Sequence, residues 1–222
     1  RVKIILDKNA DILRLPAIAL RGLVVFPGNI IHFEVGRKKS IAAIEWAMSN
    51  NNAVFLTAQQ DMDVEDPGFK DLYAYGVVAE VKQVLRVSDE LVKVLVEGKY
   101  RAKLLTLDSS GRFLLASTKA AALRGTKSVD SARVEALVRS VKEAFEEYLS
   151  LNPRLSKDVV YTIITNEDAA LLCDYIPANL LLKYTDKQAL LNEGTVSGRL
   201  EKLLEILRRE TKILHIEKDI QS

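Results

Sequence analysis

Residues 75–106 alternate between apolar and polar side chains along two arms, which are separated by Ser88-Asp89-Glu90. An alternation with a period of two is typical of strands that have one buried face and one solvated face. The short polar segment between the arms suits a turn. Gly98 lies inside the second arm, where a missing side chain often marks a bulge or a sharp bend. The sequence therefore predicts a long, bent hairpin as the basis of a curved β domain. The apolar residues of the alternation are Val77, Ala79, Val81, Leu85, Val87, Val92, Val94, Val96, Tyr100, Ala102 and Leu104.

The pattern changes in the second half of the chain. Small residues dominate positions 119–128, and apolar residues then recur three or four positions apart, as on amphipathic helices. We predict an α+β fold with a β-rich lobe at 1–118 and a helical bundle at 119–194. A last segment at 195–222 reads as the start of a long helix. The apolar residues of this last stripe include Leu200, Leu203, Leu207 and Leu214.

Composition excludes several classes of protein. Lysine and arginine number 32 and aspartate and glutamate 30, so the chain lacks the positive excess that is usual for a nucleic-acid binder. No apolar run reaches membrane-spanning length. The single cysteine, Cys173, excludes an internal disulfide and fits a reducing compartment. We expect a cytoplasmic protein that binds neither nucleic acid nor membrane.

The sequence contains no recognisable catalytic or metal-binding motif. His32 and His215 lie far apart and have no metal-ligand spacing with Cys173. There is no GxSxG nucleophile motif and no GxxxxGK[ST] phosphate-binding loop. Cys173 follows two leucines, which favours a buried small hydrophobe over a nucleophile. We predict that this chain has no active site and binds no cofactor or metal.

Binding through a surface remains the most plausible kind of activity. Phe26 and Pro27 precede a glycine at a predicted turn, and Val87 and Leu91 flank the polar hairpin tip. Apolar residues at turns are difficult to bury completely, so these four are our candidates for binding unfolded polypeptide. The alternative is that all four belong to the core at the end of a barrel.

Five segments, in order, resemble the amino-terminal domain of the Lon family of ATP-dependent proteases. They are LPAIALRGLVVFPGNIIHFEVGRKKSIAAIEWAM (15–48), DLYAYGVVAEV (71–81), VKVLVEGKYRAKL (92–104), FEEYLSLNPRL (145–155) and GRLEKLLEILRRETKILHIEKDIQS (198–222). No single motif is decisive, but the order and spacing cover nearly the whole chain.

The resemblance implies a PUA-like six-stranded pseudobarrel with one helix, followed by a helical bundle. It also implies a function: such a domain recruits unfolded or damaged polypeptide and helps to hold a hexameric ring together. The AAA+ ATPase module and the peptidase module, with its Ser-Lys dyad, follow later in such proteases. ATP and magnesium are therefore expected only in those modules, and the parent would be an ATP-dependent serine endopeptidase.

Some positions depart from the family pattern. Gly22 stands where an acidic residue is usual, and His32 and Glu34 stand where apolar residues are usual. These departures lie beside Phe26 and Pro27, within the candidate binding surface.

Two other functions stay open from the sequence. Related β domains occur in free-standing binding proteins, and PUA-like barrels also bind RNA. The chain begins at Arg1 and stops within a helical pattern, so we expect a fragment of a longer protein. The unfinished leucine stripe of 195–222 then needs a partner outside the chain, which makes it a candidate assembly helix.

Overall fold

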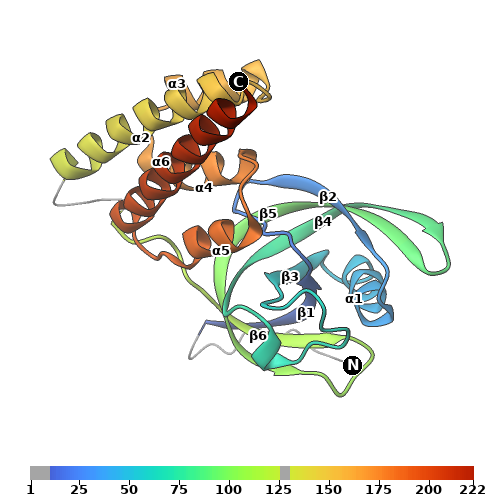
Figure 1. The fold of residues 1–222 in the computed structure, drawn as a ribbon. Helices are drawn as coiled ribbons and strands as arrows, with labels where there is room; N and C mark the ends of the chain where they lie inside the picture. Colours follow the sequence, from blue (N-terminus) through green and yellow to red (C-terminus); the bar gives the residue numbers. More distant parts are fainter. Residues whose placement is uncertain (1–10, 126–130) are drawn as a thin grey trace. The chain divides into compact units, whose positions relative to one another are not determined.

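The computed structural model describes residues 11–125 and 131–222, which form an α+β protein (Figure 1). The chain divides into two compact units, Arg1–Ala122 and Leu123–Ser222. The first unit contains the strands and the second contains only helices. The predicted fold class is therefore confirmed.

The first unit is a six-stranded, partly closed barrel. Its strands follow the order β2-β5-β4-β3-β1-β6, and β5 also pairs with β6, so every strand except β2 belongs to a closed ring. One helix, α1, packs against β1 and β3. The elements are β1 (Ile12–Leu20), β2 (Ile30–Val35), α1 (Lys38–Met48), β3 (Ala53–Ala58), the 3₁₀ turn η1 (Phe69–Asp71), β4 (Tyr75–Ser88), β5 (Leu91–Asp108) and β6 (Leu114–Ala120).

Strand β5 bends at Gly98, where the sequence predicted a bulge or a bend. Its first part pairs with β2 and its last part pairs with β6, so one long strand serves two neighbours in succession. The register with β4 shifts between Val78 and Ala79, opposite Gly98 and Tyr100. A Cβ atom on Gly98 would lie 2.3 Å from the carbonyl oxygen of Phe26, so this crossing requires glycine. The predicted bend is confirmed.

A second register shift corrects the predicted alternation. It lies between Val81 and Gln83 of β4, and an extra residue there moves the side chains that follow, as far as the next shift between Arg86 and Ser88, to the opposite face. Beyond the shift, Val84 packs against the core, while Leu85 and Val87 are exposed. Strict alternation had put Leu85 and Val87 in line with the buried Val77, Ala79 and Val81, because it does not reveal a bulge, although Val87 was also a candidate for exposure at the hairpin tip.

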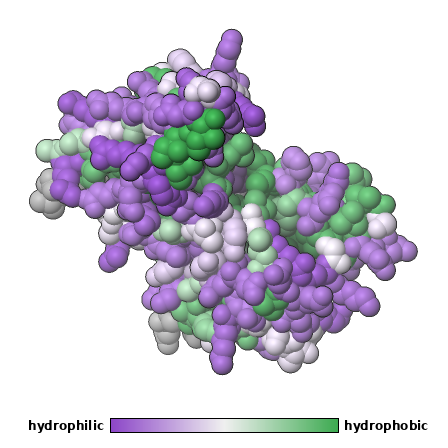
Figure 2. Space-filling model, in the orientation of Figure 1, coloured by the Kyte–Doolittle hydropathy of each residue, from purple (hydrophilic) through white to green (hydrophobic). Residues whose placement is uncertain are grey.

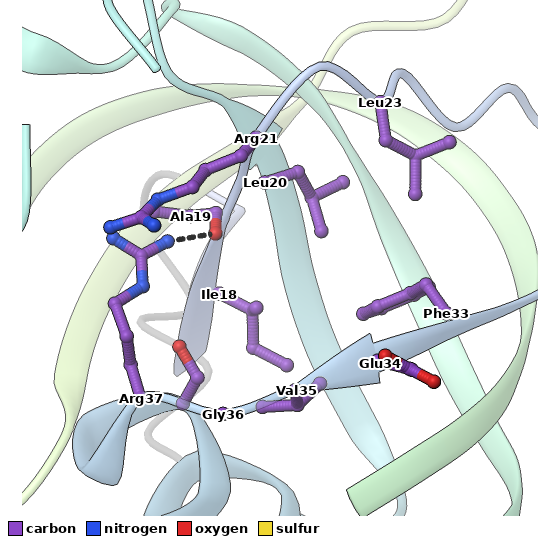
Figure 3. A pocket seen from close by; sticks show the side chains of 11 residues that line it. Ile18, Ala19, Leu20, Arg21, Leu23, Phe33, Glu34, Val35, Gly36 and Arg37 are labelled. Carbon is purple, nitrogen blue, oxygen red and sulfur yellow. Dashed lines mark hydrogen bonds between the residues drawn. The ribbon is translucent and has the colours of Figure 1, made fainter. Parts of the chain in front are cut away.

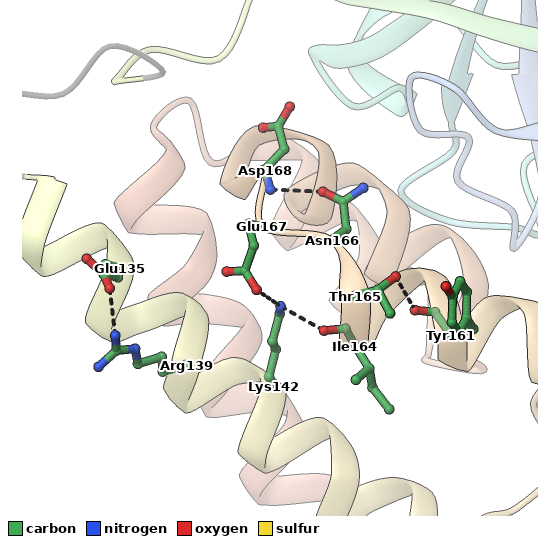
Figure 4. Close-up of polar contacts among 9 residues, drawn as sticks. All are labelled: Glu135, Arg139, Lys142, Tyr161, Ile164, Thr165, Asn166, Glu167 and Asp168. Atoms are coloured by element: carbon green, nitrogen blue, oxygen red, sulfur yellow. Dashed lines mark hydrogen bonds and ion pairs between the residues drawn. The ribbon is translucent and has the colours of Figure 1, made fainter.

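The second unit is a bundle in which α6 contacts α2, α4 and α5. Its helices are α2 (Ser131–Leu151), α3 (Lys157–Thr165), α4 (Ala169–Asn179), α5 (Tyr184–Asn192) and α6 (Val196–Gln221). Polar contacts also join α2 to the end of α3 and to the connection between α3 and α4. Lys142 Nζ donates to the carbonyl oxygen of Ile164 (3.1 Å) and lies 3.2 Å from Glu167 Oε1 (Figure 4).

Helix α4 contains Pro177 and continues past it to Asn179. Proline has no N–H to donate to the carbonyl four residues earlier, that of Cys173. The guanidinium of Arg199, on α6, donates to that carbonyl instead (3.5 Å) and lies 2.5 Å from Asp174 Oδ1. A side chain from another helix thus replaces the missing hydrogen-bond donor, which explains why the helix tolerates the proline.

Cys173 is buried, and its Sγ lies 3.7 Å from the carbonyl oxygen of Val196. Burial raises the pKa of the thiol to about 12, because the anionic thiolate loses hydration. At pH 8 the thiolate fraction is on the order of one in ten thousand. We therefore expect iodoacetamide to leave the native protein unmodified at pH 8 and to alkylate Cys173 fully in denaturant, as measured by intact mass.

The same pKa shift makes the folded state less stable in alkali. The unfolded thiol ionises near its usual pKa of about 8.5 while the folded thiol keeps its proton, so this contribution to stability falls from about pH 8.5 to about pH 12. Rapid alkylation of the native protein at pH 8 would contradict the burial.

Candidate functional site

The candidate metal ligands of the sequence do not come together in the described part of the chain. Within residues 11–125 and 131–222 no three His, Cys, Asp or Glu side chains come together to hold a metal ion. The two histidines are exposed on different elements: His32 lies on β2, and His215 lies on α6, 3.7 Å from Glu147. No helix in the described part of the chain is both long and apolar enough to span a bilayer.

Phe26, our first candidate binding residue, is a core residue with an exposed fraction of 0%. Its carbonyl accepts a hydrogen bond from Asn29 (3.0 Å), which closes a tight turn in which Gly28 has a φ of +80°. The turn is held against β5, because Gly28 donates to the carbonyl of Gly98 (2.8 Å). The turn backbone lies outside while the aromatic ring points inward. The proposed exposure of Phe26 was therefore wrong, and Pro27 is only half-buried.

The outer face of the β4–β5 hairpin gathers apolar side chains where strands usually present polar ones. Val87 is 51% exposed and Leu85 is 62% exposed, while Leu91 and Leu95 are half-buried. The pairings of Leu85 with Lys93, Gln83 with Leu95 and Ser88 with Leu91 set Leu85, Leu91 and Leu95 on one face of the hairpin. Val87 lies beside them in the sequence, at the register shift between Arg86 and Ser88. Hydrophobic surface over this arm is visible in Figure 2. We call Leu85, Val87, Leu91 and Leu95 the hairpin patch.

The sequence prediction found half of this patch. Val87 and Leu91 were candidates because they flank the tip. Leu85 was missed because the bulge in β4 changes its face. Leu95 was missed as well, although its sequence position is unusual: it is an apolar residue among the polar positions of β5, between Lys93 and Glu97.

Pro27 does not belong to the same surface as the hairpin patch. The turn that contains Pro27 contacts β5 at Gly98, whereas the tip lies at Leu91. Seven residues of extended strand separate these points, a distance of roughly 23 Å. The four candidate residues therefore do not form one patch.

Two sets of ionic contacts flank the hairpin patch, one near the tip and one nearer the bend. Arg86 Nη2 lies 2.6 Å from Glu45 Oε1 and so ties the hairpin to α1. Nearer the bend, Lys82 and Lys99 each lie 3.0–3.3 Å from Glu80 and Glu97. Hydrogen bonds from the two lysines lower the pKa of both glutamates. Two lysines face two glutamates, so the border of the hairpin patch is charged but its charges balance.

The apolar face of the candidate assembly helix is mostly buried within its own unit. Leu200, Leu203 and Leu207 are completely buried in the bundle, and Leu214 is half-buried. The expectation that this stripe needs a partner outside the chain was wrong for its first half, because α2 covers it. The apolar residues that remain exposed on α6 are Ile213, Ile216 and Ile220.

The described residues thus form a β pseudobarrel, which carries an apolar hairpin arm, and a separate helical bundle. Residues 14–209 match the family model of the ATP-dependent protease La (LON) substrate-binding domain. The chain belongs to this family.

Among curated relatives, the Lon protease of Desulforamulus reducens is 38% identical over 96% of this chain, and the Lon protease of Escherichia coli is 36% identical over 97%. The matched regions make up 26% and 27% of those relatives, so the chain spans about a quarter of their length.

Solved structures give the same fold. The N-terminal domain of Mycobacterium avium complex Lon protease aligns with a TM-score of 0.70 at 20% identity, covering 88% of this chain and 98% of that one. A Lon N-terminal domain protein from Xanthomonas campestris aligns with a TM-score of 0.56 at 16% identity, covering 86% and 97%. The resemblance that the sequence suggested is thus confirmed.

Proposed function

We propose that this chain is the non-catalytic recognition part of an ATP-dependent Lon-type protease and that it binds unfolded or damaged polypeptide through the hairpin patch. The observation that carries the proposal is the set of four apolar side chains on an arm that projects from the barrel. Exposed apolar surface of this kind is typical of interaction sites, and unfolded chains expose the apolar side chains that folded ones bury.

A small patch suits broad recognition. A site that must accept many sequences cannot depend on detailed side-chain complementarity. We propose that weak contacts repeated around a hexameric parent hold a substrate for threading while each single contact releases it readily. ATP hydrolysis and peptide-bond cleavage by a Ser-Lys dyad belong to other modules of that parent. The single Cys173 fits a cytoplasmic location for it.

Replacing both leucines of the patch tests this function. We expect Leu85→Ser with Leu95→Ser to weaken binding of a permanently unfolded protein about five- to thirtyfold, since roughly 1–2 kcal/mol of apolar contact is lost. Fluorescence anisotropy of the labelled unfolded protein measures the affinity. Thermal unfolding of the variant shows whether the fold is intact.

A matched control replaces another exposed leucine by serine. Leu181 is 76% exposed and lies in the helical unit, so Leu181→Ser should leave the affinity unchanged. Equal affinities of the double variant and the unmodified chain would rule out the hairpin patch as the binding site.

A further inference from the structure

A hollow of about 330 Å³ lies in the barrel between the end of β1 and strand β2 (Figure 3). It lies where β1 runs on beyond its pairing with β6. Strand β6 pairs with β1 only through residues 12–17, and β2 pairs with β5 alone among the described strands. Most of the wall is apolar, formed by Ile18, Leu20, Leu23, Phe33 and Val35.

One end of the hollow is closed by Arg37. Its guanidinium donates to the carbonyl of Ala19 (2.6 Å) and to the carbonyl of Glu65 (3.4 Å), so the side chain spans from the start of α1 to two other segments. A second hollow, lined by Arg37, Lys39 and Pro67 among others, lies beyond it. Arg37 therefore forms a wall between two cavities.

The same end carries an excess of positive charge. The guanidinium of Arg21 lies beside that of Arg37 (Figure 3), and neither is within 4 Å of a carboxylate among the described residues. The nearby carboxylate of Asp66 is engaged by Lys39 at 3.1 Å. Burial and the proximity of Arg21 both lower the pKa of Arg37, so the charge of this pair is only partly compensated.

Other features of the hollow favour an anion at that end. Helix α1 begins there, its N-cap makes no side-chain hydrogen bond, and its first turn has no acidic residue. Its partial positive charge therefore adds to that of the arginines. Glu34, the one acidic side chain of the lining, lies on the side of the hollow opposite the arginines (Figure 3).

We propose that this hollow binds the carboxyl-terminal residue of an extended polypeptide, with its apolar side chain against the barrel wall and its α-carboxylate on Arg21 and Arg37. The inference rests on the proposed function and names a class of substrate for it: unfolded chains that end in an apolar residue. Arginine suits this role because its planar donors match a carboxylate.

Size and shape select a chain end. The volume lies at the lower limit of ligand pockets, which measure about 300–1,000 Å³, so it suits one or two residues. An internal acidic residue would need the chain to continue past Arg37, which closes that end. A terminal carboxylate needs no exit.

Two peptides and three variants test the proposal by fluorescence anisotropy. The first peptide is short, unstructured and ends in leucine with a free carboxylate, and the second has the same sequence with a carboxyl-terminal amide. We expect the amide to bind about tenfold more weakly, because charge-assisted hydrogen bonds are lost. Arg21→Gln and Arg37→Gln should lower the affinity for the free acid to that of the amide and leave the affinity for the amide unchanged.

Arg112→Gln is the matched control, since Arg112 is an exposed arginine outside the hollow, and it should bind both peptides normally. Arg21 is exposed, so Arg21→Gln keeps the test valid even if Arg37→Gln perturbs the fold. Equal binding of acid and amide, or unchanged binding by Arg21→Gln, would overturn the proposal. If unfolded protein still bound through the hairpin patch, the proposed function would stand; if no unfolded chain bound at all, both would fail.

Discussion

Arg199→Ala should lower the free energy of unfolding by about 3–5 kcal/mol, the usual cost of removing one partner of a buried ion pair. Arg199 is 0% exposed, and its guanidinium donates to Asp174 Oδ1 and to the carbonyls of Cys173 and Glu193. Alanine would remove the donor that replaces the missing N–H of Pro177 and would leave a cavity between α4 and α6. Urea unfolding followed by circular dichroism measures the change.

Arg208→Ala is the control for that experiment. Arg208 lies on the same helix but is exposed, so the same change of residue type should alter stability by less than about 0.5 kcal/mol. A similar loss for both variants would mean that α6 depends on arginine for helix formation rather than on the buried contact.

Phe26→Ala should cost about 3–5 kcal/mol of unfolding free energy, because it removes a completely buried aromatic side chain. The loss should be larger than that of Val87→Ala, which truncates an exposed residue and should change stability by less than about 0.5 kcal/mol. Chemical denaturation of both variants separates the core residue from the surface residue.

For the affinity for unfolded protein we expect the reverse order: Val87→Ala should have the larger effect. At a temperature where Phe26→Ala is still folded, its affinity for unfolded protein should equal that of the unmodified chain. Val87→Ala should weaken binding, since Val87 belongs to the hairpin patch. A stable Phe26→Ala variant that fails to bind would restore Phe26 as a contact residue.

Sequence patterns were sufficient to locate the strands and helices, but not to tell which side chains of the long hairpin face the core. Alternation revealed β4 and β5, and Gly98 marked the bend. The bulge after Val81 has no glycine or proline signal, so the faces of Leu85 and Val87 could not be derived. Registers depend on pairing between distant residues, and local patterns do not contain that information.

The other differences between the sequence-based predictions and the structure come from tertiary contacts. Pro177 normally indicates the end of a helix, yet Arg199 from another helix supplies the missing donor. The stripe of α6 looked unpartnered because a sequence does not state which helix covers which stripe. The hollow between β1 and β2 was also invisible in the sequence, since Arg21 and Arg37 come together only in the folded barrel.

An NMR titration of the chain with a permanently unfolded protein, beside its folded counterpart, tests the central claim most directly. We expect shifts of the amide signals at residues 83–95 with the unfolded form alone, since only that form presents apolar segments to the hairpin patch. Shifts that are absent at high concentration, or equal with the folded counterpart, would contradict recognition by this domain.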